Sequence, residues 1–306
     1  MNIQLTDVAI IGGGPAGLSA ALVLGRARRS VVVIDEGKPR NRVTREMHGF
    51  LTRDGISPEQ FRQAAREQFS AYPSIRYVED AAVAASGMNG RFQVTTARGT
   101  IVNSRKLLFA TGMKDAPLGI EGLMDVYGVS AFVCPYCDGW ELRDQPLAVI
   151  AKGGHAMHLA RTLSGWTSIR MVCSDGPAEL SSEHRLEMKR HGVPVYEAPI
   201  ERIVSNDGIV ERIELVDGMS VPCRGIFFAP RLVPGSRLPM TLGCQVTHAG
   251  TIVVDAFGKS SVPGIYGAGD AATELYQAIV AAAKGSLAAV GINAEMIDES
   301  WEGGGR

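Results

Sequence analysis

The pattern of apolar and polar residues at the start of the chain predicts a strand, a turn, a helix and a second strand. A short apolar run ends at Gly12, and a helical run follows from Pro15 to about Arg28. A β-rich run then covers Val31–Ile34 and ends in the acidic residues Asp35 and Glu36. This order predicts one βαβ unit at the N-terminus.

Three glycines in the turn of this unit have the spacing of a dinucleotide-binding motif. Gly12 lets the chain turn, Gly14 lets backbone approach a pyrophosphate, and Gly17 lets the helix pack closely on the strand. Asp35 follows the second strand, where a carboxylate can accept hydrogen bonds from a ribose. The pattern predicts dinucleotide binding at the helix N-terminus, and a glycine-rich structural turn is the alternative.

The middle of the chain repeats this architecture. Leu147–Ala151 predicts a strand, Gly154–Leu163 a helix and Ser168–Cys173 a strand. In this second unit the turn glycine is replaced by Ala151, and Ala156 occupies the third position. The motif is therefore incomplete in the second unit.

The remaining periodic segments predict further strands and two helices. Ser57 and Pro58 are suited to begin a helix that runs to Ala71. An alanine-rich helix is expected from Leu275 to about Met296, followed by a disordered tail, Glu302–Arg306. The other predicted strands are Ile75–Val78, Arg91–Thr96, Thr100–Asn103, Lys106–Ala110, Val193–Tyr196, Ile209–Val216 and Gly225–Phe228.

Composition places the chain among soluble globular proteins. Its 306 residues are 45% hydrophobic and 21% charged, which at roughly 150 residues per domain suggests two domains. The net charge of −1 gives no reason to expect nucleic acid as a partner. The apolar stretch Val8–Gly25 contains five glycines and a proline, so we expect no membrane span there. No secretory signal is visible, and a cytoplasmic location is expected.

Cys134 and Cys137 form the sharpest local motif, Cys-Pro-Tyr-Cys. In a βαβ protein without a disulfide framework, this spacing indicates a redox pair. A structural zinc site would need two further ligands, and no metal is expected. The other cysteines are isolated and are interpreted as small buried hydrophobic residues: Cys173, Cys223 and Cys244.

Three residues beside the cysteines have two interpretations each. Asp138 can serve as an acid or base for thiol chemistry, or it can be a turn residue before Gly139. Tyr136 and Trp140 can shield the disulfide or receive a substrate, and ordinary packing explains them equally well.

Taken in order along the chain, these motifs resemble those of bacterial low-molecular-weight thioredoxin reductases. The resemblance rests on the first glycine motif, Ala110-Thr-Gly112, Cys134–Gly139 and Gly267-Ala-Gly269-Asp270. It implies a homodimeric α/β enzyme that binds FAD. It also implies two Rossmann-like, three-layer nucleotide-binding domains, the second inserted into the first. On this basis we expect an FAD-binding domain at 1–115 and 244–306 and a central domain at 116–243.

The resemblance also assigns roles to residues. Cys137 would be the thiol that faces the flavin, Cys134 the thiol that exchanges with substrate, and Asp138 the proton donor. Asp270 would bind the ribityl chain of the flavin. The full set expected to bind FAD is Gly12, Gly14, Pro15, Ala16, Gly17, Asp35, Glu36, Arg40, Asn41, His48, Val83, Ala110, Thr111, Gly112, Gly269, Asp270, Gln277 and Ala278.

The central domain departs from the NADPH-dependent members of this family. Besides Ala151 at the turn, the segment Cys173–Glu179 offers acidic residues and no arginine where a 2′-phosphate would need a cation. Asp175 would repel the phosphate, whereas the 2′-hydroxyl of NAD(H) is chemically allowed. The sequence predicts weak use of NADPH.

A second resemblance is to a divergent branch of the family. The run from Pro39-Arg40-Asn41 to His48-Gly49-Phe50 is similar to that of deeply rooted thioredoxin reductases. It is also similar to that of the dithiol oxidases that make disulfide natural products such as gliotoxin and holomycin. Arg40, Asn41 and His48 would then lie against FAD, the alternatives being a solvated basic run and a loop histidine. Those oxidases carry His after the second cysteine, where this chain has Asp138.

The sequence therefore predicts an FAD-dependent thiol–disulfide oxidoreductase that is not driven by NADPH. The expected partner is a thioredoxin-like protein or a small-molecule dithiol or disulfide, with a ferredoxin-like protein as a candidate electron donor. The alternatives are an NAD(P)H-dependent thioredoxin reductase, an oxygen-using dithiol oxidase, and a non-enzymatic flavin-bound redox sensor.

Overall fold

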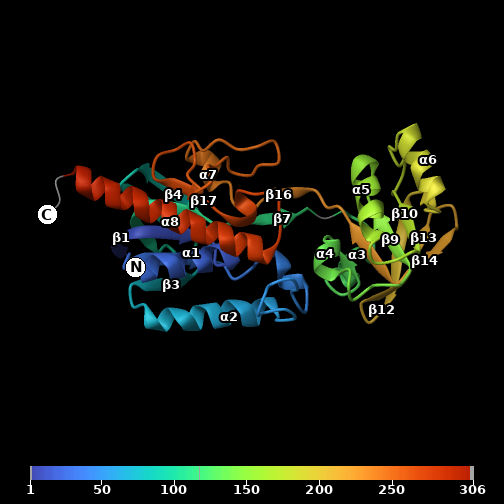
Figure 1. The fold of residues 1–306 in the computed structure, drawn as a ribbon, viewed down its shortest axis with the longest axis horizontal. Coiled ribbons are helices and arrows are strands. Elements are labelled where there is room, and N and C mark those ends of the chain that lie inside the picture. The colour runs from blue at the N-terminus through green and yellow to red at the C-terminus, as the bar shows by residue number, and fades with distance from the viewer. Residues whose placement is uncertain (1, 117, 304–306) are drawn as a thin grey trace.

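The computed structural model describes residues 2–116 and 118–303 and shows two lobes joined by a narrow link (Figure 1). The link is the antiparallel pair of β7 (Met113–Asp115) and β16 (Leu232–Pro234). The chain therefore leaves the first lobe, builds the second lobe and returns beside its own exit.

A seven-stranded sheet forms the centre of the first lobe. Its order is β3-β2-β1-β6-β5-β4, and β17 also pairs with β6. Strand β6 has β1 along one edge, while the other edge pairs first with β5 and then with β17. The strands are β1 (Asn2–Ile11), β2 (Val31–Asp35), β3 (Ile75–Glu79), β4 (Ala82–Met88), β5 (Arg91–Thr96), β6 (Ile101–Phe109) and β17 (Ile265–Gly267).

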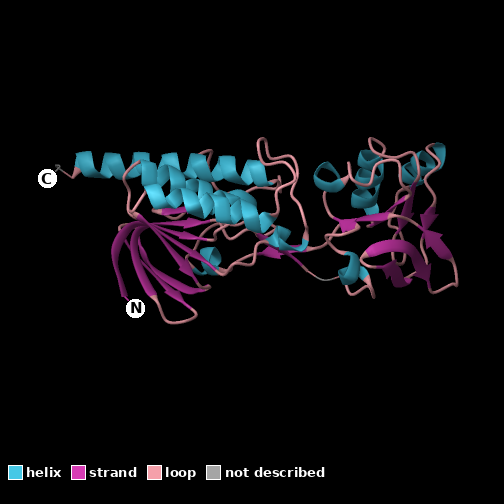
Figure 2. Cartoon of the chain, turned by 90° about the horizontal axis from the view of Figure 1, so that it is seen from below, coloured by secondary structure: helices cyan, strands magenta, loops and turns pink. Residues whose placement is uncertain are grey.

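Two helices cover one face of this sheet (Figure 2). They are α1 (Pro15–Arg26) and α8 (Ala278–Glu302), and they approach closely because Gly285 presents no side chain to the backbone of Ala16. A Cβ at Gly285 would overlap the carbonyl oxygen of Ala16. Ser57 caps the N-terminus of helix α2 (Pro58–Gln68), and its hydroxyl accepts a hydrogen bond from the amide of Gln60, so this predicted cap is confirmed.

The second lobe is built around a parallel five-stranded sheet of order β11-β10-β9-β15-β8. Its two faces carry different layers, because alternate side chains of each strand point to opposite sides. Helices pack on one face and a three-stranded antiparallel sheet on the other. These elements are β8 (Ala131–Phe132), β9 (Leu147–Ile150), β10 (Arg170–Cys173), β11 (Val195–Tyr196), β15 (Gly225–Phe228), α5 (Gly153–Leu163), α6 (Ser182–Arg190), β12 (Ile200–Asn206), β13 (Ile209–Leu215) and β14 (Ser220–Pro222).

Short helical turns complete the fold. They are η1 (Arg40–Val43), η2 (Phe69–Ala71), α3 (Leu123–Val126), α4 (Pro135–Asp138), α7 (Leu238–Thr241) and η3 (Gly269–Ala271). Two lobes with a parallel sheet in each, the second inserted between β7 and β16, confirm the predicted α/β architecture. Within the described residues, no helix is both long and apolar enough to cross a bilayer.

Several details differ from the sequence predictions. Thr100–Asn103 and Lys106–Ala110 were expected as two strands, but β6 is one strand over Ile101–Phe109, because it pairs with β1 along its whole length. Strands β4 and β12 and helix α6 were not expected. Helix α8 continues to Glu302, and the rest of the predicted disordered tail includes residues 304–306, which lie outside the described residues.

Candidate active site

One cavity of about 430 Å³ brings together most of the predicted site residues. Its first-lobe walls come from the turn after β1, the ends of β2 and β6, the loop at η1, and the segments before and at the start of α8. The second lobe contributes Cys134, Tyr136, Cys137 and Asp138. The predicted FAD-binding residues that line it are Gly12, Gly14, Pro15, Ala16, Asp35, Glu36, Arg40, Asn41, His48, Ala110, Thr111, Gly112, Gly269, Asp270, Gln277 and Ala278.

Two of the expected binding residues do not line this cavity. Gly17 packs against β1, where a Cβ would overlap the carbonyl oxygen of Gly12, and this close approach is the role expected of it. Val83 is 56% exposed on β4, and its neighbours Ala81 and Ala82 line the cavity instead. The structure thus separates Val83 from the other candidates.

The glycine turn after β1 leaves room for a ligand. Gly12 adopts a φ of +109°, and a Cβ there would overlap the carbonyl oxygen of Ala110. At Gly14 a Cβ would meet no atom within 4 Å, so this backbone is open toward the cavity. The N-termini of α1 and α8 both border the cavity, and the first amides of a helix have no partner within the helix. These features fit the pyrophosphate of a dinucleotide.

Asp35 is held in place by the protein itself. Its carboxylate accepts hydrogen bonds from the amide of Gly13 at 2.9 Å and from the hydroxyl of Tyr77 at 2.6 Å. The guanidinium of Arg62 lies 2.5 Å away and balances its charge. Burial and the bond to Asp35 raise the pKa of Tyr77 to about 12, so the phenol stays protonated and donates. Sequence reasoning missed Arg62 and Tyr77, because they lie far from Asp35 in the chain.

The guanidinium of Arg40 forms an ion pair and is not solvated. Its guanidinium lies 2.7 Å from Asp115 at the end of β7, and the hydroxyl of Tyr127 donates to the same carboxylate at 2.6 Å. Arg40 also lies over the ring of Tyr276, 5.4 Å from its centroid. The interpretation of Arg40 as one charge in a solvated run is therefore wrong, since its side chain is 17% exposed.

Asp270 is a partly buried acid that lines the cavity. Burial raises the pKa of its carboxyl group to about 6, although the positive charge of Arg40 opposes this effect. A carboxyl group in such a position gains free energy when it accepts hydrogen bonds from hydroxyl groups of a ligand. The polyhydroxylated chain of FAD would supply such groups.

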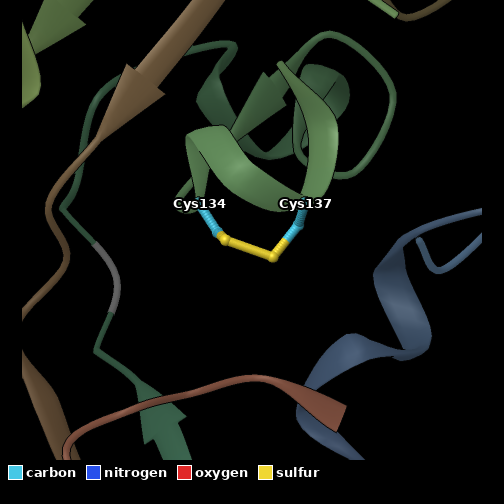
Figure 3. The surroundings of a disulfide bond; sticks show 2 residues. All are labelled: Cys134 and Cys137. Carbon is cyan, nitrogen blue, oxygen red and sulfur yellow. A yellow bond between two sulfur atoms is a disulfide. The ribbon is translucent and has the colours of Figure 1, made fainter. Parts of the chain in front are cut away.

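The two cysteines form a disulfide that faces the cavity (Figure 3). Cys134 immediately precedes α4 and Cys137 lies within it, which brings their Cα atoms to 5.3 Å. The three other cysteines are buried, as predicted. Burial raises the pKa of the Cys173 and Cys223 thiols to about 12, so neither is a reactive thiolate.

Asp138 lies beside this disulfide as a half-buried acid. Burial raises the pKa of its carboxyl group to about 7, with a further rise from Glu141 and an opposing effect of His48. Such a group is partly protonated near neutral pH and can donate a proton to a departing thiolate. Asp138 ends α4 and lines the cavity, so its carboxyl group is placed for the acid role that the sequence suggested.

Exposed aromatic rings flank the cysteine motif. Tyr136 is 71% exposed and meets Trp166 edge to face, while Trp140 is 65% exposed beneath the guanidinium of Arg143. Both rings are therefore far more accessible than ordinary packing would leave them.

The strand-to-helix turn of the second lobe is built differently from that of the first. Only Ala151 and Lys152 separate β9 from α5, and the positive φ, +53°, falls on Gly153. The amide of Gly153 donates to the carbonyl oxygen of Ala178 at 2.8 Å. Asp175 accepts the amide of Ile200 at 2.8 Å, so its carboxylate is tied to the start of β12.

Comparison with known proteins identifies the family. The family model for pyridine nucleotide-disulphide oxidoreductases matches residues 6–285. This chain belongs to that family. A member of this kind, a thioredoxin reductase-like disulfide oxidoreductase, depends on FAD, which agrees with the cavity described above.

Individual members of the family match over most of their length. The chain is 31% identical to a thioredoxin reductase, aclD, of Aspergillus oryzae, covering 97% of this chain and 98% of that protein. It is 34% identical to a probable thioredoxin reductase of Arthroderma benhamiae, covering 87% and 74%. The solved structure of a putative thioredoxin reductase from Bacillus anthracis superposes with a TM-score of 0.92 at 37% identity, covering 96% and 99%.

Proposed function

We propose that this oxidoreductase transfers electrons between FAD and a thiol substrate through Cys134 and Cys137, and that NADPH is not its electron donor. The observation that carries the proposal is that the disulfide and the glycine turn at Gly12–Gly14 line one cavity. A cofactor held by the turn would thus lie within reach of the cysteines. We assign FAD to residues 1–115 and 244–306, and the exchanging pair to the central domain, 116–243.

The exchange reaction proceeds in two displacements at sulfur. A thiolate of a dithiol substrate attacks Cys134, the disulfide breaks, and Cys137 departs with the electron pair and takes a proton from Asp138. The second substrate thiolate then displaces Cys134, so that the substrate becomes a disulfide and the protein pair becomes a dithiol. The two electrons of this dithiol would pass to FAD, which the turn at Gly12–Gly14 and Asp270 would hold and which would supply the electron acceptor. The reverse sequence would reduce a disulfide substrate.

The start of α5 supports a donor other than NADPH. The amide of Gly153 donates to the carbonyl oxygen of Ala178, so it is occupied where a pyrophosphate would need a free amide. Asp175 and Glu179 bring carboxylates to the segment after β10 and disfavour a 2′-phosphate, against which the ammonium group of Lys152, beside Gly176, is the opposing charge. A ferredoxin-like protein can serve as donor in the reducing direction, and oxygen can serve as acceptor in the oxidising direction.

The exposed rings of Tyr136 and Trp140 beside the disulfide support a thioredoxin-like protein or a small-molecule dithiol or disulfide as the partner. The relatives named thioredoxin reductases support the same class of substrate. We expect a cytoplasmic homodimer.

Anaerobic stopped-flow reduction of the flavin tests this function. Dithiothreitol should bleach the flavin much faster than NADPH does. Cys134→Ser should retain FAD and show a broad long-wavelength charge-transfer band from the Cys137 thiolate, and Cys137→Ser should not. Unchanged flavin reduction by dithiothreitol in both variants would refute the role of the pair. Fast, saturable reduction by micromolar NADPH would instead establish an NAD(P)H-dependent reductase.

A further inference from the structure

His48 and Asp138 reach the same cavity from different lobes. His48 lies in the loop after η1 of the first lobe, and Asp138 ends α4 of the second. Resting on the proposed thiol–disulfide exchange, we propose that His48 is a positioning residue that restores the proton of Asp138 and exchanges it with solvent through Glu141. The reaction would then need both lobes to assemble one proton-transfer site.

The surroundings of His48 connect the cavity to solvent. Its side chain is 19% exposed, and Nε2 lies 3.7 Å from a carboxylate oxygen of Glu46 and 3.7 Å from one of Glu141. Nδ1 lies 3.7 Å from Asp54. These three carboxylates are 42–72% exposed. An imidazole can accept a proton on one nitrogen and release one from the other, so His48 can exchange protons with these groups.

Glu141 is the carboxylate that reaches His48 from the second lobe. It follows the cysteine motif by four residues and lies in the second lobe, whereas Glu46 and Asp54 share the lobe of His48. Glu141 also acts on Asp138, whose pKa it raises. One acidic residue therefore faces both groups.

The charges facing Asp138 act in opposite directions. Protonated His48 lowers the pKa of the Asp138 carboxyl group, while burial and Glu141 raise it. Tyr127 is the third ionisable neighbour. Burial and the hydrogen bond to Asp115 raise the pKa of that phenol, and the charge of Asp138 adds to this effect. Because Tyr127 stays neutral, the charges that act on Asp138 in opposite directions are those of His48 and Glu141.

The proton balance follows the exchange reaction. When a substrate thiolate opens the disulfide, Cys137 leaves with the electron pair, and Asp138 gives it a proton and becomes a carboxylate. The imidazolium of His48 then returns a proton to Asp138 and recovers one from solvent at the exposed carboxylates. One proton is released by the substrate thiol and one is taken up from solvent, so protons balance. The electron pair that Cys137 carries away is balanced by the pair with which the substrate thiolate forms its bond to Cys134.

Carboxyl ¹³C NMR of the full-length flavoprotein, labelled at aspartate Cγ, measures how His48 and Glu141 change the pKa of Asp138. The Asp138 signal is assigned by its loss in Asp138→Asn. His48→Gln should raise the Asp138 pKa and Glu141→Gln should lower it, each by about half a pH unit or more. His48→Arg, which keeps a positive charge, should hold the pKa near the wild-type value. Glu46→Gln is the matched control on the first lobe and should move it less than Glu141→Gln.

Anaerobic flavin bleaching by dithiothreitol measures whether His48 must release a proton during exchange. His48→Gln should slow it by about 10-fold, and His48→Arg should remain slow, because arginine cannot release its proton. Equal Asp138 pKa values in wild type and His48→Gln, or a wild-type rate in His48→Arg, would overturn the proposal. Failure of the cysteine variants to affect exchange would refute the proposed function instead, and the NMR shifts are independent of that result.

Discussion

The backbone amide of Gly153 donates a 2.8 Å hydrogen bond to the carbonyl oxygen of Ala178. This bond brings the segment after β10 against the first turn of α5. The segment is held from its other side as well, because the amide of Ala178 donates to Glu197 at 2.9 Å. Arg185 pairs with the same carboxylate at 2.7 Å. The chain thus supplies its own acceptor at the helix end where a dinucleotide would place a phosphate.

Nicotinamide dinucleotides should therefore bind weakly. We expect NADH to bind no worse than NADPH, because the segment carries Asp175 and Glu179 and repels an added phosphate. The loss of one charge-assisted phosphate contact alone weakens binding by about 10- to 150-fold. Calorimetric titration with each dinucleotide checks this. Lys152→Gln is the informative control, since tight NADPH binding that this substitution abolishes would reveal a phosphate site at the turn.

Two glycines of the first turn should respond differently to a side chain. Gly14→Val adds its side chain to open space at φ −79°, so the protein should fold normally but lack FAD. Gly12→Ala places a Cβ on the carbonyl of Ala110 at positive φ, and it should destabilise the fold itself. Flavin absorbance per chain and thermal unfolding of the two variants separate these effects. Normal FAD content in Gly14→Val would contradict the assignment of the cofactor to this turn.

Asp138→Asn should remove a pH dependence from thiol exchange. With a pKa of about 7, the wild-type carboxyl group is protonated below neutral pH and loses its donor proton above it. Relative to the thiolate content of the substrate, wild-type exchange should fall as pH rises through 7. The variant should lack this change and be slower by ~10²-fold at acidic pH. Rapid-mixing measurements from pH 5.5 to 8.5 check both. Identical profiles would leave Asp138 without a catalytic role.

Lys106 should be important for stability rather than for chemistry. Its ammonium group is fully buried and contacts Asn89 at 2.8 Å, Glu295 at 2.5 Å and Glu299. Lys106→Met leaves these carboxylates without their partner and should cost about 3–5 kcal/mol in the free energy of unfolding. Denaturant titration measures the loss. The double variant with Glu295→Gln should lose less than the sum of the single variants, because the two side chains interact.

The same cluster gives stability a defined dependence on acid. Burial alone would raise the pKa of Glu295, but hydrogen bonds from Lys106, Lys259 and Tyr266 lower it to about 2. Because its folded-state pKa lies below the unfolded value, Glu295 stabilises the protein fully above about pH 4.5 and loses this effect as pH falls toward 2. With Glu295→Gln, the free energy of unfolding should fall less steeply between about pH 4.5 and pH 2. An unchanged dependence on pH in this range would show that other groups control it.

Sequence reasoning worked where a short motif determines its own geometry. Gly12, Gly14 and Gly17 each meet a local requirement of one turn, and the spacing of Cys134 and Cys137 places both sulfurs at one end of α4. Gly17 and the two cysteines could be found because their partners lie within a few positions along the chain. Gly12 could be found from the motif spacing, although the carbonyl of Ala110 that it must avoid is distant in sequence.

Contacts between distant segments left no comparable pattern in the sequence. The pairing of Arg40 with Asp115, of Asp35 with Arg62, and of His48 with Glu141 joins residues whose proximity depends on the whole fold. Val83 illustrates the converse, because its predicted role came from resemblance alone and its side chain faces outward.

The lobes also meet at Gly128, which no motif singled out. Gly128 adopts a φ of +82°, and a Cβ there would overlap the carbonyl oxygen of Val43 in the first lobe. Gly128 is needed because a side chain there would collide with a distant loop. In the sequence it looks like any other turn glycine.

The pairing of β17 with β6 also bears on how the protein is made. Leu107 and Ile265 are neighbours in the sheet although the entire second lobe lies between them in sequence. Closing so long a loop is slow relative to forming local contacts. During synthesis, the N-terminal strands would emerge from the ribosome well before Gly269 and Asp270, which complete the cavity. FAD would therefore be captured only after release of nearly the whole chain, and truncated products would accumulate without it.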